Sequence, residues 1–183
     1  DGDLGVGVGP VRVEAVAPQQ FQSLISSNSM PRPSGFSLPQ AKHMLATCYR
    51  ETGRTSEAKA LLDDYLRDHP DSTRALITMA SILSEEGKTE EVLALAKRVL
   101  AEDDRNTEAY ALMAGVYMNA NDHSGALPLL EKAVEIQPKL TRNRLNLAAA
   151  NVGLGRFTVA ESMLDEIIAE RPKFPLAHFH LGL

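Results

Sequence analysis

Residues 39–70 read PQAKHMLATCYRETGRTSEAKALLDDYLRDHP, and this stretch decides the fold. The pattern on both sides of Gly53 predicts two short amphipathic helices joined by a turn. The same pattern returns three more times, once every 34 residues. A pattern repeated at a fixed spacing of this size is typical of helical arrays whose units share a core with their neighbours. The sequence therefore predicts an all-α solenoid.

Aligning the copies without a gap gives four complete units and the start of a fifth. They cover residues 39–72, 73–106, 107–140 and 141–174, with a partial unit at 175–183. Each first helix has a Leu or Met followed by Ala, and each turn has Gly or Asn, which tolerate the left-handed backbone at a helix C-terminus. The small residues are Ala46, Ala80, Ala114 and Ala148, and the turn residues are Gly53, Gly87, Asn121 and Gly155.

These recurring residues closely resemble the tetratricopeptide repeat (TPR) family over residues 39 to about 182. The resemblance implies a right-handed α-solenoid of helix-turn-helix units, whose first helices line a concave surface that binds peptides or helices. The family's usual first-helix Trp is absent. Lys42, Leu76, Tyr110 and Arg144 stand in its place, and Asn151 replaces a bulky residue of the fourth unit.

Residues 1–38 have a different composition, rich in Gly and Pro, which predicts a mostly irregular N-terminal arm or linker. Apolar and polar residues alternate weakly over 11–16, so a short strand is possible there. A short helix is possible over 19–28, with Phe21, Leu24 and Ile25 on one face.

Composition and motifs exclude several function classes. The net charge is −5, with both signs interspersed, so no basic surface suggests a nucleic-acid partner. No apolar run is long enough to span a membrane, so we expect a soluble protein of the cytoplasm or periplasm. The scattered His residues and surface carboxylates match no catalytic, cofactor or metal motif, so we expect no enzymatic activity, no cofactor and no metal. Cys48 is interpreted as a small core residue.

The groove implied by the resemblance can be assigned residue by residue from the face of each first helix opposite the small residues. Its lining changes from polar to apolar toward the C-terminus, which favours a partner segment of apolar character, with Arg74 and Arg142 orienting an acidic flank. The predicted groove residues are His43, Thr47, Arg50, Arg74, Ile77, Ser81, Glu108, Ala111, Gly115, Met118, Arg142, Leu145, Ala149, Val152 and Phe179.

The leading hypothesis is thus a non-catalytic scaffold that binds a protein segment. The residue pattern with which some TPR proteins grip a chaperone's C-terminal carboxylate is absent. Two alternatives stay open. The chain is an accessory TPR region of a larger, catalytic protein, such as a bacterial sulfatase or glycosyltransferase, or it self-assembles through the arm at 1–38 or through its open, apolar C-terminal end.

One local feature conflicts with the repeat. Pro128 falls inside the expected second helix of the third unit, where it removes a hydrogen-bond donor. The sequence predicts that this helix begins late, near Ser124, or bends slightly at Pro128.

Overall fold

The computed structural model describes residues 38–170, which are α-helical with short turns. The predictions for the arm before residue 38, for the partial fifth unit and for Phe179 lie outside these residues. The helices are α2 (Leu38–Glu51), α3 (Thr55–Asp68), α4 (Thr73–Glu85), α5 (Thr89–Glu102), α6 (Thr107–Asn119), α7 (His123–Ile136), α8 (Thr141–Gly153) and α9 (Phe157–Glu170). Three of the predicted pairs pack together: α4 with α5, α6 with α7, and α8 with α9.

The turns inside the four pairs have the same backbone geometry. Gly53, Gly87 and Gly155 have φ between 71° and 75°, and Asn121 has φ 56°. After each of them, a backbone N–H donates to a carbonyl five residues back, as in the turn from Arg54 to Tyr49 at 2.7 Å. This is the 6→1 bond of a Schellman motif, which satisfies a free carbonyl at the end of the first helix. The predicted left-handed turn residues are confirmed.

The chain divides into two compact units, one ending at Leu62 and the other beginning at Asp63. In the first unit, Leu45, Ala46 and Tyr49 of α2 and Ala58 and Leu62 of α3 are buried. Cys48 is half-buried, so it is more accessible than the buried core residue that the sequence predicted.

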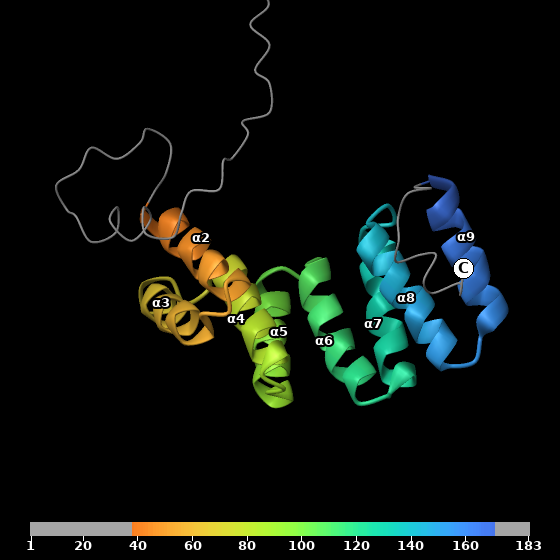
Figure 1. The fold of residues 1–183 in the computed structure, drawn as a ribbon, viewed down its shortest axis with the longest axis horizontal. Helices are drawn as coiled ribbons and strands as arrows, with labels where there is room; N and C mark the ends of the chain where they lie inside the picture. Colours follow the sequence, from red (N-terminus) through yellow and green to blue (C-terminus); the bar gives the residue numbers. More distant parts are fainter. Residues whose placement is uncertain (1–37, 171–183) are drawn as a thin grey trace, which may run out of the picture. The chain divides into compact units, whose positions relative to one another are not determined.

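In the second unit, the helices from α4 to α9 each pack against the next one along the chain. Figure 1 shows that α6 and α7 join at one end and α7 and α8 at the opposite end, so α6 and α8 run in the same direction. The first helix α6 also contacts α4 and α8. First helices of successive pairs therefore lie side by side.

The core of this unit contains clusters of buried residues, two of which join neighbouring pairs. One contains Leu76, Ala96, Val99 and Ala109 of α4, α5 and α6, and a second contains Ala114, Ala126, Leu130, Leu147 and Ala150 of α6, α7 and α8. A third joins α8 to α9. Because the first two clusters take side chains from successive pairs, a single helix pair could not bury its apolar face alone.

The helix that contains Pro128 begins next to the predicted position near Ser124. It starts at His123, because the Asp122 side chain accepts a hydrogen bond from the Gly125 backbone N–H at 2.8 Å and caps it there. Pro128 is the sixth helical residue and is exposed. The helix thus begins one residue before Ser124, close to the predicted start, and Pro128 lies beyond its first turn.

Candidate functional site

The candidate site is the face that α4, α6 and α8 present beside one another in the second unit. Among the predicted groove residues there, Arg74, Glu108, Arg142 and Val152 are exposed. Half-buried positions separate them along the same helices: Ile77, Ser81, Ala111, Gly115, Met118 and Ala149. In the first unit, His43, Thr47 and Arg50 of α2 are half-buried as well.

Gly115 lies in the middle of α6 at the centre of this face. A Cβ atom built on it meets no atom within 4 Å beyond its own stretch of helix, among the residues that the structure describes. Packing inside this part of the chain therefore gives no reason for a glycine here. A mid-helix glycine destabilises a helix by roughly 0.5–1 kcal/mol relative to Ala, so the position keeps open space above α6 at a cost in stability.

Several polar side chains of the face already donate hydrogen bonds within their own helices. The Ser81 hydroxyl donates to the carbonyl oxygen of Ile77 at 2.9 Å, and the Thr47 hydroxyl donates to that of His43 at 3.1 Å. The Arg50 guanidinium pairs with Glu51. Because these hydroxyl protons are already donated, Ser81 and Thr47 could only accept hydrogen bonds from a ligand.

Leu145 differs from the other predicted groove residues. It is only 7% exposed and belongs to the core cluster with Ala148, Leu164 and Ile167. Because eight of the thirteen residues of α8 are buried, the exposed stripe of this helix is narrower than the sequence predicted. Leu145 therefore stabilises the contact of α8 with α9, and it is no probe of the exposed face.

Arg144, at the position where the family usually has Trp, is almost fully buried. Its guanidinium donates to Glu166 at 3.0 Å and to Glu170 at 2.7 Å, both on α9. The two carboxylates are more than half exposed, while the Arg144 side chain is 9% exposed. The sequence identified Arg144 as a departure from the family but gave no sign of its partners, which are 22 and 26 residues away.

A second group that the sequence did not predict joins α6, α7 and α8. The Nδ1 atom of His123 lies 3.3 Å from the sulfur of Met118. The same imidazole covers Gly153, where a Cβ atom would lie 2.4 Å from the ring. Met118 is therefore held at the edge of the face by a neighbouring ring.

Other classes of site were searched for in the described residues. Between residues 38 and 170, no three or more His, Cys, Asp or Glu side chains are grouped so that they could hold a metal ion. None of the helices in this range has both the length and the apolar character needed to cross a membrane.

Comparisons with known proteins identify the fold. Two family models, both for the tetratricopeptide repeat, match the chain, one over residues 39–82 and the other over residues 83–139 and 117–179. No curated protein matches this chain. The resemblance predicted from the repeated residues is thus confirmed.

Solved structures with the same fold have low sequence identity to this chain. A Parabacteroides merdae tetratricopeptide repeat protein has a TM-score of 0.68 at 22% identity, over 90% of this chain and 66% of its own. YrrB, a TPR protein with an unusual peptide-binding site, has a TM-score of 0.64 at 17% identity. The match covers 91% of this chain and 82% of YrrB. Thermobaculum terrenum O-GlcNAc transferase has a TM-score of 0.58 at 19% identity. The match covers 62% of this chain and 22% of the transferase. At these identities the likeness is one of fold.

Proposed function

The chain belongs to the tetratricopeptide repeat family, and from this we propose that it binds a segment of a partner protein on the face formed by α4, α6 and α8. A role in protein–protein interaction follows from the repeat itself, since stacked repeats create extended surfaces for partners. The proposal adds the place of binding and the character of the bound segment.

The open space above Gly115 carries the proposal. A side chain at this position would improve the helix and would meet no described neighbour, so the glycine has no purpose in folding that the structure reveals. Close approach of another backbone or a bulky side chain is one of the uses of glycine in proteins. Met118, Ala149 and Val152 give this part of the face an apolar character, which suits an apolar segment of the partner.

The experiment compares peptide binding by three variants of the full chain. Short random peptides displayed on phage are selected against the wild type, and the selected peptides are synthesised and titrated by fluorescence anisotropy. Gly115→Leu should weaken binding about tenfold or more, because the new side chain fills the open space. Ala94→Leu is the matched control, since it adds a bulky apolar side chain to an exposed position of α5, a second helix.

Two results would contradict this proposal. One is a failure to select any peptide. The other is a set of peptides whose affinity Gly115→Leu leaves unchanged, which would place binding elsewhere on the chain.

A second candidate function is that of a repeat region serving a larger enzyme. The observation in its favour is the likeness to part of an O-GlcNAc transferase, of which this chain covers 22%. The mass of the native gene product decides between the candidates. A mass well above 19.9 kDa, with a catalytic region in the added sequence, supports the second candidate, and a mass near 19.9 kDa rejects it.

A further inference from the structure

The charge along α8 and its flanking turns is one-sided. From Ile136 to Ala160 the sequence contains no Asp or Glu, although the whole chain has a net charge of −5. The same stretch contains four cationic residues, Lys139, Arg142, Arg144 and Arg156. A local excess of positive charge in an acidic chain has to be explained by partners inside or outside the molecule.

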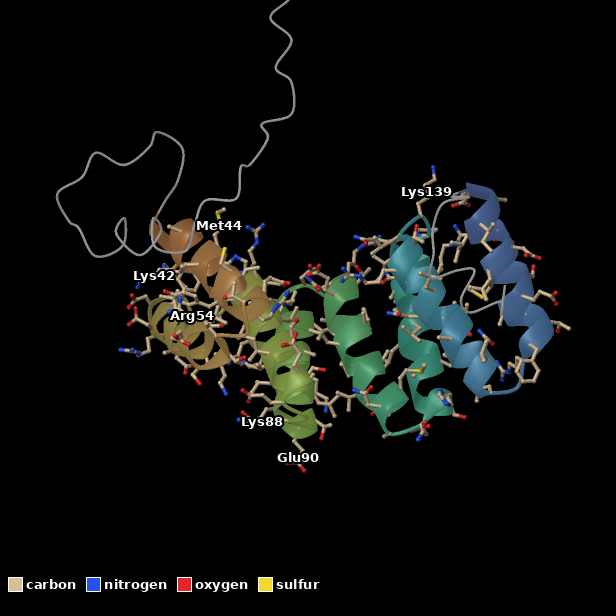
Figure 2. All side chains as sticks on the ribbon, in the orientation of Figure 1. Lys42, Met44, Arg54, Lys88, Glu90 and Lys139 are labelled. Atoms are coloured by element: carbon tan, nitrogen blue, oxygen red, sulfur yellow. The ribbon has the colours of Figure 1, made fainter. Side chains whose placement is uncertain are left out.

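Only one of these cations has an ion-pair partner in the described part of the chain. Arg144 is buried and is neutralised by Glu166 and Glu170. Lys139 and Arg142 are exposed, and the described residues contribute no carboxylate within ion-pair distance of either. Figure 2 shows the Lys139 side chain pointing away from the turn between α7 and α8. Lys139 and Arg142 at the beginning of α8 are therefore available to a partner, as is the exposed Arg156 in the turn after α8.

Exposed apolar side chains accompany them. Leu140, which lies between Lys139 and the start of α8, is 39% exposed, and Val152, near the other end of α8, is 37% exposed. Large apolar residues with this exposure are few among residues 38–170. The exposed stripe of α8 thus has two cations and an apolar residue at its beginning and an apolar residue near its end.

We propose that the segment bound on this face is acidic at one end, with its carboxylates against Lys139 and Arg142 and its apolar side chains along α8 toward Val152. This rests on the proposed function above and specifies the chemistry and direction of the bound segment. Glu108, at the equivalent position of α6, is exposed and repels a carboxylate, so the acidic end is directed to α8.

The length of α8 sets the spacing in the bound segment. Arg142 and Val152 are separated by about 15 Å along the helix, at a rise of roughly 1.5 Å per residue. An extended chain covers about 3.3 Å per residue, so the acidic and apolar residues of the partner should be about five positions apart.

An acidic protein segment fits this surface better than a polyanion does. Nucleic acids and anionic membranes need several clustered cations for useful affinity. The surface around α8 offers Lys139 and Arg142 at one end and the single Arg156 after the other, and the chain as a whole is acidic. A partner that combines few carboxylates with apolar contacts matches both features of α8.

The test measures the composition and charge dependence of selected peptides. Peptides selected on the wild-type chain should be enriched in Asp and Glu at one end. Arg142→Glu should weaken their binding by about three- to tenfold, and about 1 M salt, where the Debye length is about 3 Å, should reduce that difference. Lys97→Glu, at an exposed position of α5, makes the same change in net charge as the control. Peptides whose carboxylates are replaced by amides should lose their sensitivity to Arg142→Glu.

The outcomes separate this inference from the proposed function. If the selected peptides are blocked by Gly115→Leu but show no acidic enrichment and bind the Arg142→Glu chain normally, the face is correct and the acidic-segment inference is wrong. If Lys97→Glu weakens binding as much as Arg142→Glu, the effect is one of net charge and the inference is wrong. Stronger binding of anionic vesicles or oligonucleotides than of the peptides would also overturn it.

Discussion

Gly87 and Gly115 are glycines of two different kinds, and the backbone distinguishes them. Gly87 has a φ of 75°, which a side chain rarely tolerates, so glycine is needed for the turn between α4 and α5. Gly115 has an ordinary helical backbone within α6 and open space where a Cβ atom would lie. The first glycine is explained by folding, whereas the second has no neighbour among the described residues that requires a glycine.

Substitution by alanine should therefore have opposite effects at the two positions. Gly115→Ala should raise the free energy of unfolding by about 0.5–1 kcal/mol, because it improves the helix without a clash. Gly87→Ala should lower it by about 1 kcal/mol or more, because alanine is strained at positive φ. Urea denaturation followed by circular dichroism measures both values. A loss of stability in Gly115→Ala would show that a contact of this residue has been overlooked.

The acidic titration of Glu57 provides a second residue-level test. The Arg54 guanidinium donates a hydrogen bond to Glu57 at 2.9 Å and holds the pKa of that carboxyl below its ordinary value. Because the folded pKa is lowered, this pair stabilises the fold above the ordinary pKa of Glu, about 4.3, and the stabilisation is lost as the pH falls through the folded pKa. Arg54→Gln should raise the pKa of Glu57 toward its ordinary value, as measured by NMR titration of the side-chain carboxyl carbon. Lys88→Gln, in a different turn, should leave it unchanged.

At the scale of the helices, the second helices of the four pairs begin in three different ways. In α3 and α5 a cation just before the helix pairs with a Glu three residues later, Arg54 with Glu57 and Lys88 with Glu91. In α7, Asp122 caps the backbone instead. In α9 the residue before the helix is Arg156, and the residue three places later is Val159. The repeats thus share a backbone but differ in the side chains that fix the helix starts.

The contact between α8 and α9 contains a charge pair whose two sides should respond unequally to substitution. Replacing Glu166 and Glu170 together by Gln leaves the buried Arg144 cation uncompensated and should cost about 2 kcal/mol of unfolding free energy. Arg144→Met removes the buried charge and leaves two largely exposed carboxylates. It should therefore lower the free energy of unfolding by no more than about 1 kcal/mol. Urea denaturation measures both variants.

A matched control for this pair is available on the same helix. Glu161 and Asp165 of α9 are exposed and form no ion pair with the described residues of α8. Replacing both with amides changes the net charge by the same amount. The free energy of unfolding of that variant should differ from the wild-type value by no more than about 0.5 kcal/mol. If both double variants are destabilised equally, the effect belongs to the charge of α9 and the buried pair is not responsible.

Over the whole described chain, the features that recur in every repeat were predictable from the sequence, whereas contacts that occur in only one repeat were not. The helix pairs, turn residues and small buried residues were predictable, because each depends on local backbone chemistry and appears in every unit. The burial of Leu145 was not predictable from the period of α8 alone, since it depends on how closely the neighbouring helices enclose that helix. Arg144 and its partners depend on the placement of α9, and the cap by Asp122 overrode the helix-breaking tendency of Pro128.

The pairing of Arg144 also limits how the units can be rearranged in evolution or engineering. The positions equivalent to Glu166 and Glu170, 34 residues earlier in α7, are occupied by Lys132 and Ile136. A recombinant chain in which α7 replaces α9 would therefore place an ammonium group beside a buried guanidinium. The fourth pair is consequently not an interchangeable module, and a duplication or loss of units in this chain has to keep α8 and α9 together.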